Sequence, residues 1–220
     1  MIDSIFVERD VLDHPVSQKV INRLKNADVF EIERYQEMFN RRQQNFRIQK
    51  QNPALILAKK YDNFVLPAPS GFGIDAQKNY YFSHMYNCIY DCRYCFLQGM
   101  YSSANYVLFV NYEDFFKEIT DVIAENTNDS ITFFSGYDCD SLAFEKITGF
   151  AEQAVEFFSN FNSVELELRT KSIVSDTLLK RSPISNCIVA YSLSPSNVAS
   201  ILDHKAPSCL LYTSPSPRDH

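Results

Sequence analysis

Three cysteines lie within eight residues in the segment NCIYDCRYCFLQG, residues 87–99. Cys88, Cys92 and Cys95 follow the spacing C-x3-C-x2-C, and no fourth cysteine follows at a matching interval. Iron–sulfur clusters of the 4Fe–4S type ordinarily take four thiolates. With three, one iron keeps an open position. In a loop of this spacing, that position is where S-adenosylmethionine (SAM) binds through its amino and carboxylate groups, so the residues predict a radical-SAM site.

Two other interpretations of the same cysteines stay open. They could be ordinary buried thiols, although their tight spacing at the exit of a strand argues against chance. They could also form a structural zinc site with His84, because zinc prefers four closed tetrahedral ligands. However, a strand end would separate His84 from Cys88, and structural zinc sites usually combine ligand pairs from two segments.

The predicted chemistry is borne by the cofactors. The reduced cluster would donate one electron to the SAM sulfonium, and the resulting 5′-deoxyadenosyl radical would abstract a hydrogen atom from the substrate. In such reactions the protein positions, shields and tunes the reacting groups. Tyr94, directly before the third cysteine, fits the aromatic residue usually found there in radical-SAM enzymes.

Alternating strands and helices position this loop. From residue 79 the apolar periodicity predicts strands at 79–85, 130–136, 163–170 and 186–193, and helices at 111–126, 141–160, 175–181 and 196–202. Such alternation is typical of parallel strands with crossover helices, whose chemistry lies at the carboxyl ends of the strands. We therefore predict an α/β fold, a partial (β/α)6-type radical-SAM barrel truncated after about four β-α units. Its site loops are 87–99, 135–141, 169–172 and 192–196.

The remaining segments define the predicted domains. Residues 1–66 form a small N-terminal βαβ annex with a basic stretch at 41–60, residues 67–208 form the incomplete barrel, and residues 209–220 read as a non-native tail. The net charge of −6 gives no general support for a nucleic-acid partner. Apolar runs are too short to span a membrane and no signal peptide is evident, so a cytoplasmic protein without a membrane partner is predicted.

The sequence resembles the spore photoproduct lyase family of radical-SAM enzymes over most of residues 1–208. The matching segments include VERDVLDHP, FNRRQQNFRIQK, CIYDCRYCFLQG, DSLAFEKITG, LELRTKS and AYSLSPSNVASILDHKAPS. The resemblance implies a DNA-repair lyase that opens a thymine–thymine lesion and restores two thymines. It also implies a 4Fe–4S cluster, SAM and a reducing partner such as flavodoxin or ferredoxin.

Family roles carry over to several positions of this chain. Cys88, Cys92 and Cys95 match the cluster ligands. Lys171 matches a lysine that contacts the SAM carboxylate, and Ser192 matches a serine near the same cofactor. Tyr94 matches a tyrosine that is thought to relay a hydrogen atom.

Two positions depart from the family pattern. Phe96 stands where the spore enzymes have a second tyrosine, and phenylalanine cannot pass a hydrogen atom. A gap-free match places Tyr137 at the family's hydrogen-donor cysteine, with Cys139 two residues later. Either residue is therefore a candidate donor, or the protein acts on another nucleobase, nucleotide or peptide. We expect Asp138 and Asp140 to be solvated loop carboxylates.

The basic stretch is the predicted DNA contact. Arg41, Arg42, Arg47 and Lys50 could neutralise phosphates, and Phe46 between them could stack on a base. A zinc-stabilised binding protein remains the alternative that is not an enzyme.

Overall fold

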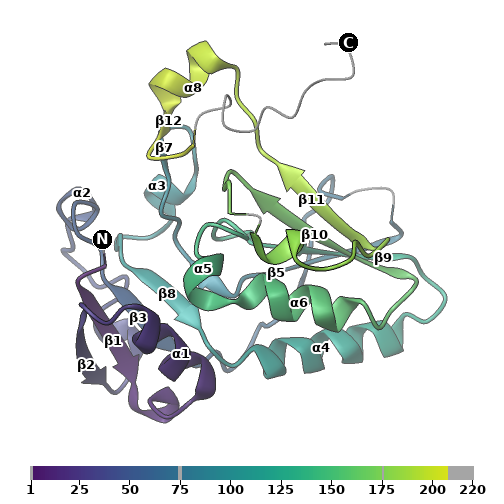
Figure 1. Cartoon of the computed structure of the whole chain (residues 1–220), viewed down its shortest axis with the longest axis horizontal. Coiled ribbons are helices and arrows are strands. Elements are labelled where there is room, and N and C mark those ends of the chain that lie inside the picture. Colours follow the sequence, from purple (N-terminus) through teal and green to yellow (C-terminus); the bar gives the residue numbers. More distant parts are fainter. Residues whose placement is uncertain (1, 74–75, 175, 208–220) are drawn as a thin grey trace.

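The computed structural model describes residues 2–73, 76–174 and 176–207. These residues form two mainly parallel sheets with helices packed around them (Figure 1). The first sheet has the order β2-β1-β3-β8-β6 and comprises β1 (Ser4–Glu8), β2 (Asp28–Ile32), β3 (Leu55–Ala58), β6 (Met85–Tyr86) and β8 (Tyr106–Phe109). The second has the order β11-β10-β9-β5-β4 and comprises β4 (Leu66–Pro67), β5 (Lys78–Phe82), β9 (Ile131–Ser135), β10 (Val164–Thr170) and β11 (Cys187–Tyr191). The predicted tail, 209–220, lies outside the described residues.

The N-terminal segment contains the predicted βαβ unit. Strands β1 and β2 pair in parallel and α1 (Pro15–Arg23) connects them. Strand β2 is largely exposed rather than half-buried, because it forms the edge of the sheet. On its other side β1 pairs with β3, and β3 pairs in turn with β8, a strand that lies after residue 66 in the sequence. The first sheet thus joins segments from both sides of the predicted domain boundary, and the division at 66 stays a prediction.

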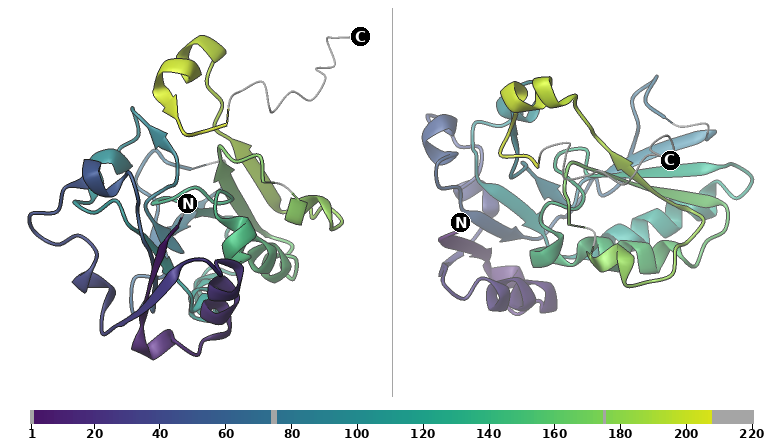
Figure 2. Two further views of the ribbon diagram at one scale, coloured as in Figure 1. Left: turned by 60° about the vertical axis from the view of Figure 1, so that its left-hand side comes forward. Right: turned by 45° about the horizontal axis from the view of Figure 1, so that its top comes forward.

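The second sheet contains the four strands predicted for the barrel. Strands β5, β9, β10 and β11 lie side by side in chain order and pair in parallel. Helices α4 (Tyr112–Glu125) and α6 (Phe150–Phe158) cover one face of this sheet (Figures 1 and 2). Leu166 and Leu168 of β10 are fully buried, whereas Arg169 is exposed. This alternation directs Leu166 and Leu168 to the face that the helices cover and Arg169 to the opposite face.

The remaining α-helices and strands are short. They are α2 (Phe46–Gln49), β7 (Asp91–Cys92), α3 (Leu97–Met100), α5 (Glu145–Thr148), α7 (Asp176–Leu179), α8 (Ser196–Leu202) and β12 (Asp203–His204). Strands β7 and β12 form an antiparallel pair that brings α8 over the cysteine segment (Figure 1).

The helix predicted at 141–160 is broken in two. Gly149 has a φ of 65°, a left-handed conformation that glycine adopts without strain, and it separates α5 from α6. The buried carboxylate of Glu145 accepts hydrogen bonds from the amides of Ala151 and Glu152, at 2.8 and 3.1 Å. These bonds satisfy amides in the first turn of α6 that have no acceptor inside the helix.

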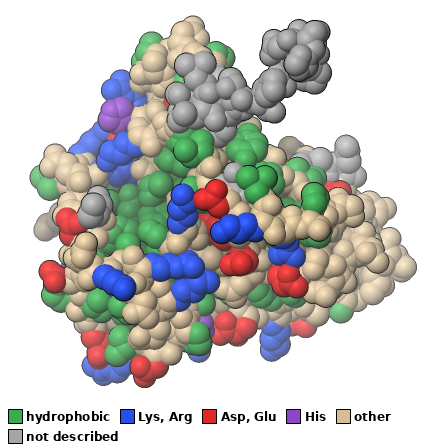
Figure 3. Space-filling model, viewed as in Figure 1, with side chains coloured by type: hydrophobic (Ala, Val, Ile, Leu, Met, Phe, Trp, Pro, Cys, Tyr) green, Lys and Arg blue, Asp and Glu red, His purple; other side chains and the backbone are tan. Residues whose placement is uncertain are grey.

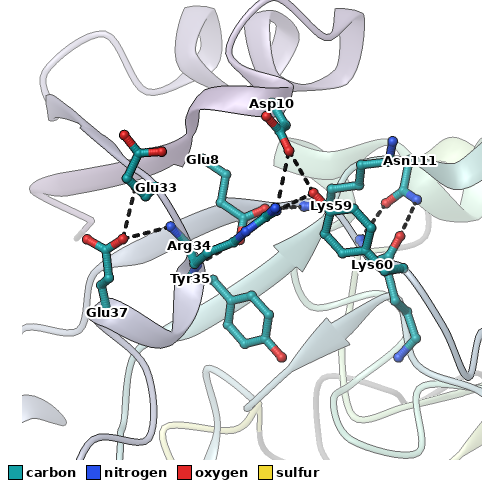
Figure 4. Close-up of polar contacts among 10 residues, drawn as sticks. Glu8, Asp10, Glu33, Arg34, Tyr35, Glu37, Lys59, Lys60 and Asn111 are labelled. Carbon is teal, nitrogen blue, oxygen red and sulfur yellow. Dashed lines mark hydrogen bonds and ion pairs between the residues drawn. The ribbon is translucent and has the colours of Figure 1, made fainter.

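Asn111 directly precedes α4, but its side chain accepts no hydrogen bond from an amide of the first turn. Instead, its amide group bonds the backbone of Lys60 in both directions, at 2.9 Å each (Figure 4). Nearby, the fully buried Glu8 accepts hydrogen bonds from the amides of Tyr35 and Lys59, at 2.7 and 2.8 Å (Figure 4). These polar contacts tie the N-terminal segment to the segment that leads into α4.

Among the described residues, no helix has both the length and the apolar character needed to cross a bilayer.

Candidate active site

All eight residues predicted for the site line one cavity of about 390 Å³. They are Cys88, Cys92, Cys95, Tyr94, Tyr137, Cys139, Lys171 and Ser192. They come from the cysteine loop and from the loops after β9, β10 and β11. Because those strands are parallel, their carboxyl ends meet at one edge of the sheet, and residues far apart in the sequence come together there. The volume is within the range of small-molecule sites, roughly 300–1,000 Å³.

The entrance to the cysteine loop is held by Asn87. Its φ of 66° is left-handed, a conformation that asparagine tolerates better than most residues. The buried side chain donates hydrogen bonds to the carbonyls of Ser103 and Asn105, both at 2.8 Å. These contacts fix the direction in which the chain leaves β6 towards Cys88.

Lys50 also holds this loop, which corrects its predicted role as a DNA contact. Its Nζ donates to the carbonyls of Cys88 and Tyr90, at 2.9 and 3.4 Å, and the residue is only 8% exposed. Burial lowers the pKa of Lys50, although nearby Asp91 and Cys88 act in the opposite direction. Arg41, Arg42 and Arg47 are exposed and remain candidates for phosphate contact.

The thiols of Cys88, Cys92 and Cys95 all lie on the wall of the cavity. No set of three His, Cys, Asp or Glu side chains in the described part of the chain is arranged to hold one metal ion. In a 4Fe–4S cluster each thiolate binds a different iron, so the sulfurs need not converge on one point. His84, the fourth ligand of the zinc alternative, is not among the residues that line the cavity. Its fully buried ring stacks on Phe150 instead, with centroids 3.7 Å apart.

Thiol ligation requires deprotonation of these cysteines. Burial raises the pKa of Cys88, and it raises the pKa of Cys92 to about 11. Metal ions bind the thiolate form, so loading a cluster would release protons from this loop.

Lys171 lines the cavity and bonds Asp203 of β12. Its Nζ donates to Asp203 Oδ2 at 3.2 Å and to the carbonyl of Ser192, and Tyr94 donates its O–H to Asp203 Oδ1 at 2.8 Å. Burial alone would lower the pKa of Lys171, but Tyr94 and Asp203 together raise it. The structure therefore places a charged ammonium group among the predicted SAM-binding residues, with Ser192 facing it through its backbone carbonyl.

Asp140 is half-buried and hydrogen-bonded rather than solvated, contrary to prediction, and it links two site loops. Its carboxylate accepts hydrogen bonds from the amides of Leu142 and Ala143 and the hydroxyl of Thr170, at 3.0, 2.8 and 2.7 Å. It also accepts from the amide of Lys171 at 2.6 Å. Asp138 is buried, with 7% exposure. The local sequence does not show that Asp140 is shielded from solvent, because two of its four donors, Thr170 and Lys171, lie about thirty residues away.

The two candidate hydrogen donors differ in their surroundings. The Tyr137 ring is 37% exposed and lies 4.5 Å from the ring of Tyr81 and 5.8 Å from that of Phe96. Burial raises the pKa of Cys139 well above its usual value, so this side chain remains a thiol at neutral pH. Gly136, which begins their loop, has a φ of 80°.

The sequence profile of the spore photoproduct lyase family matches residues 1–209. The chain belongs to the spore photoproduct lyase family. Among curated protein sequences, no significant match was found.

Solved structures of spore photoproduct lyase share this fold. A double mutant with bound AdoMet and dinucleoside spore photoproduct matches with a TM-score of 0.84 and 17% identity. A single mutant matches with a TM-score of 0.83 and 17% identity, and a complex with dinucleoside spore photoproduct with 0.80 and 16%. Each match covers 96% of this chain but 62% of the solved chain, so the sequence spans less than two thirds of those structures.

Proposed function

We propose that this chain carries the cofactor site of a radical-SAM lyase that reverses a thymine lesion in DNA. The observation that carries the proposal is the gathering of all eight predicted residues around one cavity, in a chain of the spore photoproduct lyase family. Under this proposal β5, β9, β10 and β11 are the first four strands of a partial (β/α)6 barrel, with residues 1–66 as its annex. The cavity then lies at the end of the barrel where chemistry is expected.

The donor set assigns the cofactors. Cys88, Cys92 and Cys95 would hold a 4Fe–4S cluster, and Lys171 and Ser192 would contact SAM. When bound, these cofactors would supply the one-electron chemistry that removes a hydrogen atom from the substrate. Lys171 offers its ammonium group to the carboxylate of SAM, in competition with Asp203 at 3.2 Å.

Return of a hydrogen atom to the product requires an S–H or O–H group in the cavity. Cys139 offers a thiol that its environment keeps protonated, and Tyr137 offers a phenol in the same cavity. Tyr94 can relay a hydrogen atom between them and the cofactor, whereas Phe96 lacks the necessary O–H. We assign the donor role to Cys139 or Tyr137, and the two single substitutions distinguish them.

The proposed partners follow from the same reaction. DNA would contact the exposed Arg41, Arg42 and Arg47. Figure 3 shows Lys and Arg side chains beside an apolar area on the part of the molecule that carries α2 and α8. A flavodoxin or ferredoxin would supply the electron, which would place the working enzyme in the cytoplasm.

Anaerobic reconstitution tests the proposal. We expect a 4Fe–4S signal in electron paramagnetic resonance that changes on addition of SAM, reductive cleavage of SAM, and repair of dinucleoside spore photoproduct. Cys95→Ala should abolish the signal. Cys187→Ala should leave it intact, because Cys187 is a free thiol on β11 that does not line the cavity. Zinc retained without inorganic sulfide would instead favour a zinc-stabilised binding protein.

A radical-SAM enzyme of the same fold with another nucleobase, nucleotide or peptide substrate is the second candidate. Two departures from the family pattern favour it. Phe96 replaces a tyrosine, and Tyr137 stands at the position of the hydrogen-donor cysteine, with Cys139 two residues later. SAM cleavage without repair of the dinucleoside would support this candidate and exclude the lesion as substrate.

A further inference from the structure

Three acceptors in the described part of the chain occupy the ammonium group of Lys171. An ammonium group carries three N–H donors. Those of Lys171 bond the carbonyl of Ser192, Ser194 Oγ at 3.3 Å and Asp203 Oδ2 at 3.2 Å. The side chains of Lys171 and Asp203 are only 13% and 5% exposed. A carboxylate that arrives at Lys171 must therefore replace one of these acceptors.

Asp203 is the acceptor that another carboxylate can replace. Ser192 accepts through its backbone carbonyl and Ser194 through a neutral hydroxyl, whereas Asp203 presents a charged carboxylate. Loss of this partner alone would leave the ammonium group of Lys171 shielded from water and uncompensated, which is costly. Exchange of one carboxylate for another avoids that cost, because the ion pair is kept.

The position of Asp203 also matches the expected position of the SAM carboxylate. SAM would bind the open iron of the cluster through its amino and carboxylate groups, so its carboxylate must lie beside the cluster ligands. In the antiparallel pair of β7 and β12, Asp203 stands directly opposite Cys92. Side chains at opposite positions lie on one face of such a pair, with Cβ atoms about 4.5–5.5 Å apart. Asp203 therefore lies beside both a proposed cluster ligand and the proposed carboxylate-binding lysine.

The segment that carries Asp203 is a two-residue strand. Strand β12 pairs with β7 outside the two five-stranded sheets (Figure 1). The amide of Arg93 extends this pair by one bond, to the carbonyl of Leu202 at 2.8 Å, and Tyr94 donates its O–H to Asp203 Oδ1. Short segments of this kind open locally at a low cost in free energy. Asp203 can therefore leave Lys171 without disruption of either five-stranded sheet.

We infer that Asp203 is an internal competitor for SAM, which binds Lys171 by replacing this carboxylate, so that Asp203 sets the affinity for the cofactor. The inference rests on the proposed function, because SAM is the cofactor proposed for this cavity. Before SAM binds, Asp203 neutralises the ammonium group of Lys171. A neutral side chain of the same size should leave Lys171 available to the cofactor.

Binding measurements on the reconstituted full chain test this exchange. The cluster is kept oxidised, so that no electron is available to cleave the ligand. The probes are SAM and decarboxylated SAM, which keeps the sulfonium and the amino group but lacks the carboxylate. Asp203→Asn preserves the size of the side chain and removes its charge. Asp91→Asn is the matched control, because Asp91 belongs to the same strand pair, lies opposite His204 and does not line the cavity.

The measured quantity is the affinity for SAM divided by the affinity for decarboxylated SAM. We expect Asp203→Asn to raise this ratio about fivefold or more, and Asp91→Asn to change it less than about twofold. A general effect on the shape or charge of the cavity enters both affinities and cancels in the ratio. In a Lys171→Met background, Asp203→Asn should leave the ratio unchanged. Should Asp203→Asn fail to fold, Asp203→Ser removes the same charge and supplies the test.

The inference and the proposed function fail separately. A ratio that stays the same or falls in Asp203→Asn would overturn the competition, and the proposed function would stand if the reduced protein still cleaves SAM. A raised ratio, with SAM cleavage but without repair of dinucleoside spore photoproduct, would support the competition and exclude the lesion as substrate. Absence of binding for both probes in every variant would overturn the competition together with the proposed cofactor site.

Discussion

Asp140→Asn should lower the free energy of unfolding, because Asp140 joins two loops that line the cavity. The carboxylate accepts four hydrogen bonds, and the shortest, 2.6 Å, comes from the amide of Lys171. If the asparagine oxygen keeps the three bonds at Oδ1, its NH2 group faces the Lys171 amide, donor against donor. Loss of this charge-assisted bond costs about 1.5–3 kcal/mol, and the three remaining bonds weaken because their acceptor becomes neutral.

A counter-effect reduces that cost. Burial raises the pKa of Asp140 even though all four donors act to lower it, so the charged form is itself costly to bury. A neutral amide avoids this desolvation. We therefore expect a net loss of about 1–3 kcal/mol in the free energy of unfolding.

Urea unfolding of the chain measures the loss, with Asp121→Asn as the control. Asp121 is exposed on α4, and substitutions of that kind usually change stability by less than about 0.5 kcal/mol. Hydrogen exchange supplies a second readout, because the Lys171 amide should exchange faster in Asp140→Asn. A stability change as small as that of the control, with unchanged exchange at Lys171, would refute the role assigned to Asp140.

Three further expectations follow from the contacts around the site. Gly136→Ala should cost about 1–3 kcal/mol in urea unfolding, because φ is 80° and the added Cβ would lie 2.6 Å from Ser141 Oγ; an unchanged midpoint would contradict this. Lys50→Met should release the carbonyl of Cys88 and broaden or shift the cluster signal, whereas an identical spectrum would exclude a positioning role. Burial lowers the pKa of His84 to about 3, against about 6.5 when unfolded, so its neutral form supports folding fully above pH 6.5. That support should fall by a few kcal/mol as pH drops from about 6.5 towards 3, and His84→Phe should show a shallower pH dependence of unfolding over that range.

Much of the secondary structure was predictable because it depends on local patterns. The helix at 111–126 and the strands at 130–136 and 163–170 follow directly from apolar periodicity and correspond to α4, β9 and β10. The break at Gly149 was missed, since the apolar pattern continues across it. The role of Glu145 in capping α6 was missed too, because the pattern shows spacing and not hydrogen bonds.

For the site, the sequence alone determined the residue types at its centre: three cysteines at C-x3-C-x2-C, and the loops after successive strands that would meet them. Local spacing carries that information because neighbouring ligands must reach one cofactor. Only the tertiary structure decided the contacts of Lys50 and Asp140. Lys50 contacts a carbonyl 38 residues away, and Asp140 binds an amide 31 residues away. Whether a charged side chain is solvated, paired or left with an open acceptor depends on which distant segments fold against it, and that information is not present in the adjacent residues.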